Sequence, residues 1–395
     1  MAGFTGLDNR LNSMSALGKR FQVLMSKQFN PTAAAVANEW HSYARGGGNP
    51  SADAIFDAGT NLLFQSLTDQ TASAGCLYHG GDVGAAGDDY KVLETAMVNT
   101  AAATVVPHWL QLIDILGFFR VTTVTTTTAQ NVIWPYDSGS GTTGGETTTF
   151  SSSSGLLGTY TNDIQNLSKV RFRNSGGALP TGLVAGTDYY TIRVSATTSR
   201  FATSRANAIA GTAIAFTDAG TGTNVIDVKL PRYSDGVGVQ AMFFNPQATA
   251  LGAGVPQLTL GYQSGAGTMS RATPTSPSAP IGKTAATASH ILYTGATGAG
   301  KFGPAIPLQG VDSGIRTIQT VRNNATYTSG MYTVALFKPL GEPIPVQVLG
   351  QSVPWRFDGG VRVYDGAAIY AIGKSGVATP ANSLIEASLT FGWTS

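Results

Sequence analysis

Charge is scarce in this sequence. Its 24 basic and 22 acidic residues make up 12% of 395 residues, whereas a soluble globular domain carries roughly 25%. The formal net charge of +2 provides little electrostatic repulsion between copies. The missing charge is replaced by 49 glycines and by long tracts of Thr, Ser and Ala. We therefore expect a neutral, polar exterior that neighbouring subunits cover.

Cysteine and long apolar runs are also nearly absent. The single cysteine, Cys76, excludes an intrachain disulfide, so stability must come from packing or assembly. No Lys or Arg lies close to Cys76 in sequence, which predicts a small buried side chain rather than a nucleophile. No run of about 18 apolar residues occurs, and the first residues lack a basic segment followed by an apolar one. We expect neither a membrane span nor a Sec signal, and synthesis in a cytoplasm.

The bulk composition predicts a folded protein with more than one domain. A chain of 395 residues exceeds the size at which one core keeps growing, so two or three domains are expected. Hydrophobic residues at 42% and aromatic residues at 9% are sufficient to build cores. Wholesale disorder is therefore excluded.

Residues 7–28 carry the clearest helical periodicity, with apolar residues recurring every three or four positions. Gly18 costs such a helix about 1 kcal/mol relative to Ala, so the helix needs a partner surface. We predict an N-terminal arm over residues 1–50 whose amphipathic helix docks into a neighbouring subunit, and a helix lying on a membrane is the alternative. The predicted subunit-interface anchors are Leu11, Leu17, Phe21 and Leu24.

Most of the remaining chain reads as β-strands. Residues 53–68 fit a second helix, although Gly59 makes a strand over residues 61–67 equally defensible. Beyond Val98, β-branched and aromatic runs alternate with Gly, Pro, Asn and Ser clusters, and no crossover helices separate them. This pattern predicts an antiparallel β-sandwich or jelly-roll body formed by residues 51–137 and 232–395. The predicted strands of the body are residues 105–115, 118–124, 239–244, 257–262, 315–321, 332–338, 361–364, 367–372 and 384–393.

Residues 138–231 have a different texture. Residues 138–158 form a Gly, Ser and Thr tract that reads as a flexible linker. Short strand-like runs with Gly-rich turns follow, and they predict a small inserted β-domain from about residue 150 to 231. These runs are residues 169–172, 189–194, 213–217 and 225–230.

One segment matches a phosphate-binding loop in part. Residues 295–301 (GATGAGK) follow a short apolar run, as a P-loop follows its strand. A true P-loop needs a Ser or Thr after Lys301 and a helix beyond it, whereas Phe302 and Pro304 stand here. We interpret the segment as a Gly-rich hairpin or loop, and a nucleotide hydrolase remains the third alternative.

No other pattern predicts catalysis or metal binding. The histidines are scattered, and none pairs with another ligand at a metal-binding spacing. The acidic cluster of Asp82, Asp88 and Asp89 lacks the spacing of a calcium loop, so only a weak cation site is left open there. The sequence therefore predicts no enzyme, no metal and no cofactor. The four histidines, all given structural roles, are His41, His79, His108 and His290.

The inserted domain is locally basic. Arg171 and Arg173 flank Phe172, so the two arginines share one side of a strand while Phe172 points to the other. Together with Arg193 they form a candidate contact for a polyanion or for carboxylates of a partner. We favour a solvated or inter-subunit face over nucleic acid, because no aromatic stacking platform lies beside these arginines.

Two stretches of the inserted domain carry a resemblance. Residues 170–190 (VRFRNSGGALPTGLVAGTDYY) and 216–223 (FTDAGTGT) resemble a small β-module that recurs in virion proteins of tailed bacteriophages. Residues 37–45 and 378–393 are similar to phage structural proteins encoded among head and tail genes. The resemblance implies a structural role stabilised by contacts between symmetry mates, and it brings no catalytic residues.

The composition and the resemblance together predict a structural, non-enzymatic virion protein. We expect it to be made in the bacterial host cytoplasm and to assemble on the capsid as a cement, decoration or minor shell component. The expected partners are copies of itself and other capsid or tail proteins, with no membrane and no nucleic acid. The alternative is a tail or spike protein that binds a host surface glycan through residues 150–231. The major capsid protein is less expected, because no long amphipathic spine helix is present.

Overall fold

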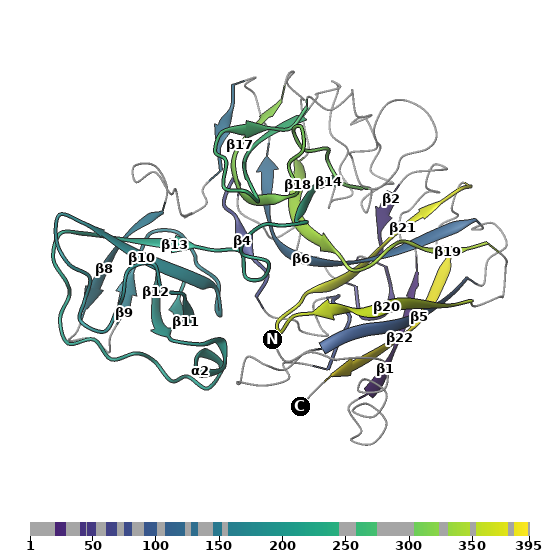
Figure 1. Ribbon diagram of the computed structural model, residues 1–395, viewed down its shortest axis with the longest axis horizontal. Coiled ribbons are helices and arrows are strands. Elements are labelled where there is room, and N and C mark those ends of the chain that lie inside the picture. The colour runs from purple at the N-terminus through teal and green to yellow at the C-terminus, as the bar shows by residue number, and fades with distance from the viewer. Residues whose placement is uncertain are drawn as a thin grey trace.

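The protein is built almost entirely of antiparallel β-strands (Figure 1). In the part of the chain that is described, α2 (Arg205–Ile209) is the one helix. The strands form three sheets and one closed barrel. The computed structural model describes residues 20–28, 40–44, 46–52, 61–68, 75–80, 91–100, 107–122, 128–132, 145–151, 157–244, 258–274, 304–323, 331–347, 353–377 and 383–393.

A five-stranded sheet joins strands from distant parts of the chain. In β22, buried and more exposed residues alternate, as expected for a strand that covers a core with one face. The strand lies between β5 and β1 and pairs with both along most of its length. In order across the sheet, the strands are β20 (Val353–Val363), β5 (Lys91–Thr100), β22 (Leu384–Trp393), β1 (Arg20–Gln28) and β3 (Gly48–Asn49).

A seven-stranded sheet is organised around the longest strand, β6. This strand is buried along almost its whole length, so its near-continuous apolar run faces protein on both sides. A bulge at Leu116 shifts the side-chain alternation midway. The main path is β14 (Gln240–Phe244), β18 (Met331–Pro339), β6 (His108–Thr122), β21 (Ile369–Ser375) and β2 (Trp40–Ser42), while β19 (Ile344–Val346) and β4 (Gln65–Ser66) also pair with β6.

A four-stranded sheet completes the body, which therefore has a sandwich-like arrangement. Leu110 and Leu112 of β6 join the apolar cluster shared with the five-stranded sheet. Beyond the bulge, Phe119 and Val121 join the cluster shared with the four-stranded sheet. A single long strand thus supplies side chains to both cores. The four strands are β16 (Arg271–Ala272), β15 (Leu258–Ser264), β17 (Ile315–Asn323) and β7 (Gln130–Asn131).

The closed barrel lies to one side of the body (Figure 1). Its core is aromatic: the Phe172 ring lies 4.8 Å from the Phe201 ring and 5.5 Å from the Phe150 ring, both in edge-on geometry. Gly158 permits this packing, because a Cβ there would lie 2.6 Å from the Phe201 ring. Around the barrel, the strands are β10 (Lys169–Ser175), β11 (Tyr189–Ser195), β12 (Thr198–Ala202), β9 (Leu157–Thr159), β8 (Glu146–Ser151) and β13 (Thr223–Val228).

The predicted N-terminal helix is wrong where it can be checked. Residues 20–28 form β1, and the rest of the predicted helix lies outside the described residues. Met25 and Lys27 are buried while Leu24 is 63% exposed, which is the alternation of a strand and not the stripe of a helix. Nine residues of β22 pair with β1, so tertiary pairing overrides the local helical pattern.

Other elements also depart from the sequence-based prediction. Residues 61–68 hold β4 and two further pairings to β6, which excludes the helix there and agrees in part with the alternative strand over residues 61–67, and residues 53–60 lie outside the described residues. The two strands predicted over 105–124 are one strand, β6. The strand predicted at 213–217 is irregular. Two parts of the predicted flexible linker form β8 and β9, and β5 was not predicted at all.

The remaining predicted strands of the body coincide with β14, β15, β17, β18, β20, β21 and β22, although β20 begins earlier than predicted. In β10, Phe172 points into the barrel and is 1% exposed, while the two flanking arginines point outward, as their alternation indicated. The mainly-β, antiparallel class is thus confirmed.

Candidate functional site

Where the chain returns from the barrel to the body, Arg232 forms a buried ion pair with Asp114 of β6. Arg232 and Asp114 are both almost fully buried. Arg232 Nε and Nη2 donate to the two carboxylate oxygens at 2.8 and 2.7 Å. The remaining guanidinium protons go to the carbonyl oxygens of Leu67, Ile115 and Gly366. All five donors of Arg232 are therefore satisfied, which is the condition for a stable buried arginine.

The turn between β20 and β21 lies against this ion pair. The Gly366 carbonyl oxygen of this turn accepts from Arg232, and the Ala368 amide donates to Asp114 Oδ1 at 2.9 Å. Gly366 has φ of +67°, and a Cβ there would lie 2.7 Å from both Arg205 Nη2 and the Thr68 carbonyl oxygen. Arg205 Nη1 in turn donates to that Thr68 oxygen at 2.7 Å. Glycine therefore allows the body turn, residue 68 and helix α2 of the barrel to meet.

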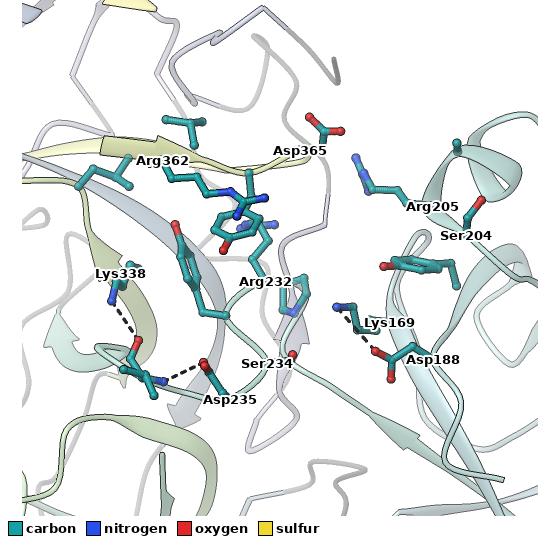
Figure 2. Close-up of a pocket in the computed structure, with 18 of the residues that line it drawn as sticks. Lys169, Asp188, Ser204, Arg205, Arg232, Ser234, Asp235, Lys338, Arg362 and Asp365 are labelled. Carbon is teal, nitrogen blue, oxygen red and sulfur yellow. Dashed lines mark hydrogen bonds and ion pairs between the residues drawn. The ribbon is translucent and has the colours of Figure 1, made fainter. Parts of the chain in front are cut away.

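A cleft of about 900 Å³ opens beside this junction, between the barrel and the body (Figure 2). The barrel wall comes from β10, β11 and the segment around α2, and the body wall comes from β18, β20 and the segment after Pro231. Charged side chains and tyrosines dominate both walls. They are Lys169, Asp188, Tyr190, Arg205, Arg232, Tyr233, Asp235, Lys338, Arg362, Tyr364 and Asp365.

Burial perturbs the titratable groups of the cleft. Desolvation lowers the pKa of Lys169, and Asp188, whose carboxylate lies 3.9 Å from the ammonium, opposes that shift only in part. The pKa of Lys338 is also lowered by desolvation, with Asp235 acting in the opposite direction. Burial raises the pKa of Tyr190. The cleft therefore holds partly desolvated ammonium groups.

Aromatic rings on the body wall are already engaged by cations. Tyr233 and Tyr364 meet edge to face at 4.8 Å and 77°. The Arg362 guanidinium lies 4.3 Å from the centre of the Tyr364 ring, and Lys338 Nζ lies 5.5 Å from that of Tyr233. Lys338 Nζ also donates to the Val237 carbonyl oxygen at 2.9 Å. These contacts hold the basic side chains against the wall.

The arginines singled out from the sequence each have a carboxylate partner within the barrel. Arg171 pairs with Asp188. Arg173 Nε lies 3.0 Å from Asp227. Arg193 binds Asp163 in bidentate fashion at 2.9 and 3.1 Å. None of the three lines the cleft described above, although Asp188, the partner of Arg171, does.

Of the four predicted interface anchors, two can be placed. Phe21 and Leu24 lie on β1, where Leu24 points away from the core. Leu11 and Leu17 lie outside the described residues. The surface that Leu24 occupies is the outer face of the five-stranded sheet, not a helix.

Three histidines are buried within the body, as structural roles require. Burial lowers the pKa of His79 to about 3, with Lys91 as the second cause, and burial lowers that of His108 to about 3 as well. His108 Nε2 lies 3.0 Å from the Tyr43 hydroxyl. Lys91 Nζ lies 2.7 Å from His79 Nδ1, so Nδ1 accepts and Nε2 donates to the Ala367 carbonyl oxygen. The lowered pKa values keep the His79 and His108 rings neutral at pH 7.

Cys76 is buried, as predicted. His290, the GATGAGK segment at 295–301 and the three-aspartate cluster lie outside the described residues. Within the described ranges, no group of three His, Cys, Asp or Glu side chains is arranged to hold a metal ion. No helix in the described part of the chain is long and apolar enough to cross a membrane.

Sequence reasoning missed the cleft as a site. Its walls come from residues between 169 and 365, and no local spacing connects them. The weak signal that was available is the basic character of the inserted domain, which includes Arg205. In the sequence, Lys338 and Arg362 are isolated charged residues within predicted strands. Only the fold places them opposite the barrel.

No protein-family model matches this chain, and no curated protein matches it. Among solved structures, the chain matches the unassembled KI polyomavirus VP1 pentamer with 10% sequence identity and a TM-score of 0.13, over 95% of this chain and 94% of that chain. A likeness at this level carries no argument about fold family or function.

Proposed function

We propose that this protein is a structural, non-enzymatic component of a tailed-phage virion. It assembles with copies of itself and with other capsid proteins as a cement, decoration or minor shell subunit, and the jelly-roll description of its body remains part of this proposal. The observation that carries the proposal is the outer face of the five-stranded sheet. The charge-poor composition and the resemblance of the barrel segment to a phage β-module support the same role.

This outer face combines an apolar row with almost no charge. Leu24, Met97 and Pro354 fall in one row across β1, β5 and β20, with Ser388 of β22 between the first two. Leu24 is 63% and Met97 38% exposed. Large apolar side chains gathered on an exposed sheet face are a feature of association surfaces. The rows on either side of it consist of Gln22, Thr390, Thr95 and Arg356, and of Ser26, Glu386 and Asn99.

The neutral rows favour burial against another subunit. Serine, threonine, asparagine and glutamine lose less on desolvation than charged residues, and they form hydrogen bonds across an interface. Arg356 and Glu386 balance each other in these rows, and Arg20 in the next row of β1 lies 3.3 Å from Glu94, so the face has no net charge. A second copy therefore meets little electrostatic repulsion there, and repeated contacts in a closed assembly multiply a modest affinity.

Introducing charge into the apolar row tests the proposal. The double variant Leu24→Glu/Met97→Glu places two carboxylates in the apolar row and should leave a folded subunit that no longer self-associates in sedimentation-velocity runs. Val311→Glu is the matched control, because Val311 is 99% exposed on a loop away from this sheet. A parent protein that stays monomeric at every concentration, or a double variant that associates as the parent does, would contradict the proposal.

The glycan-binding alternative rests on a separate feature. The sequence predicts glycan binding through residues 150–231 and, separately, a polyanion or partner contact at Arg171, Arg173 and Arg193, each of which has an intramolecular carboxylate partner. The cleft, which needs the body as well as the barrel, is a better placed site for such a ligand.

A further inference from the structure

The cleft between the barrel and the body has the size and shape of a ligand site. Its volume of about 900 Å³ lies within the range of known small-molecule pockets, about 300–1,000 Å³. Figure 2 shows Lys169 and Arg205 on the barrel wall and Lys338 and Arg362 on the facing body wall. A ligand lying in the cleft would be reached by basic side chains from both sides.

The walls carry more positive than negative charge. Asp188 lies beside Lys169 and also binds Arg171, which lies outside the cleft. Asp365 faces the buried Lys91 at 4.0 Å. Two of the three wall carboxylates are thus shared with cations behind the walls. Leaving the Arg232–Asp114 pair aside, the described groups are three carboxylates and six basic side chains: Lys91, Lys169, Arg171, Arg205, Lys338 and Arg362.

Two lysines gain most from an incoming anion. The Lys338 ammonium donates to the Val237 carbonyl oxygen, a neutral acceptor, and the Lys169 ammonium is 3.9 Å from a carboxylate that it shares. Both ammonium groups are partly desolvated, which lowers the pKa of each lysine. An ammonium that has lost water without gaining a close counter-ion forms a strong charge-assisted hydrogen bond when an anion arrives.

The other wall groups select the kind of anion. Asp188, Asp235 and Asp365 are hydrogen-bond acceptors suited to hydroxyl groups, and they repel a chain with a charge on every unit. The rings of Tyr233 and Tyr364 already contact Lys338 and Arg362, so they offer a poor platform for stacked bases. This combination disfavours nucleic acid and favours a hydroxyl-rich chain with widely spaced carboxylates.

We infer that the cleft binds a short stretch of an acidic polysaccharide. One sugar carboxylate binds Lys169 on the barrel wall, another binds Lys338 on the facing body wall, and neighbouring hydroxyl groups donate to the wall aspartates. Because both walls are required, neither the barrel nor the body alone forms the site. The inference goes beyond the assembly function, and the sheet face that carries that function contributes none of these residues.

The test uses the full chain and an array of bacterial polysaccharides in which repeats bearing uronic or sialic acid are matched with neutral repeats. Acid-bearing repeats should bind, and binding should weaken as salt is added. Lys169→Met and Lys338→Met keep the length of the side chain and should each weaken binding about tenfold, the effect of losing one charge-assisted hydrogen bond. Arg200→Gln is the control, because Arg200 is an exposed barrel cation outside the cleft.

Thermal melts of the lysine variants establish that they remain folded. The Leu24→Glu/Met97→Glu variant should still bind the acid-bearing repeats, so a failure of the assembly proposal and a failure of this one are distinguishable. The inference is overturned if no acid-bearing repeat binds, if neutral repeats bind equally well, or if folded lysine variants bind as the parent does. Tighter binding of a single-stranded oligonucleotide than of any polysaccharide would overturn it too.

Discussion

Replacing Asp114 by Asn should be among the most destabilising single changes in the body. Asp114 Oδ2 accepts from Arg232 Nε, and Oδ1 accepts from Arg232 Nη2 and the Ala368 amide. The asparagine amide would point an N–H group at a guanidinium N–H group and leave the arginine charge uncompensated. Breaking a buried ion pair in this way costs about 3–5 kcal/mol. That is a large part of the total stability of a typical domain, about 5–15 kcal/mol.

Urea unfolding at pH 7, followed by tryptophan fluorescence and circular dichroism, measures this loss. The matched control is Asp163→Asn, which removes one partner of the Arg193 pair. Both side chains of that pair are about one-third exposed, so the change should cost less than about 1 kcal/mol. Equal unfolding midpoints for Asp114→Asn and Asp163→Asn would refute the reasoning, because burial would then make no difference.

A double replacement separates the charge from the packing. Asp114→Leu with Arg232→Met removes both charges and fills part of the space, so it should be less destabilised than Asp114→Asn alone.

Hydrogen exchange measures the effect of Asp114→Asn on the junction itself. In Asp114→Asn, faster exchange is expected in residues 364–368 and in α2, which meet at this point, while the interior of the barrel stays protected.

Two further outcomes follow from buried groups. Burial lowers the pKa of His79 and of His108 from the usual 6.5 to about 3, so the unfolded chain takes up protons first as the pH falls. The stability contribution of these histidines is complete above about pH 6.5 and declines toward pH 3, by up to about 1.4 kcal/mol per pH unit for each histidine. His108→Gln should flatten that slope by one proton in urea titrations at several pH values, and an unchanged slope would contradict the assignment. Phe172→Ala should lower the free energy of unfolding of the barrel by about 3–5 kcal/mol and should speed amide hydrogen exchange in β10 and β13 but not in β6. Equal changes of exchange rate in the barrel and in β6 would argue against a separate barrel core.

The sequence alone is sufficient to predict those strands in which the residue types distinguish a buried face from an exposed face. In β10, a phenylalanine between two arginines defines an inner and an outer face without help from the rest of the chain. Strands such as β17 and β18 are β-branched or aromatic runs bounded by turn residues, and their positions follow from that pattern. Local information is enough wherever one strand face is buried and the flanking turns are marked.

Local information failed where strand pairing decides the structure. The β1 sequence RFQVLMSKQ contains apolar residues both at helical spacing and in alternation, and its pairing with β22 selects the alternation. The β5 sequence KVLETAMVNT contains good helix formers, yet the strand lies between β20 and β22. Both strands are held by partners that are remote in sequence, so no window of neighbouring residues contains the deciding contacts.

The same remoteness links folding to the proposed assembly. The barrel forms from strands within about 80 residues of one another, whereas Gln22 and Ser388, which meet in the five-stranded sheet, are 366 residues apart. Contacts between distant residues are slower to form, because a long loop has to close first. The apolar row needs residues of β1, β5 and β20 in register, so it exists only after that late step. A subunit that associates through this face therefore does so only once its own sheet is complete, and partly folded chains do not present the row to the growing assembly.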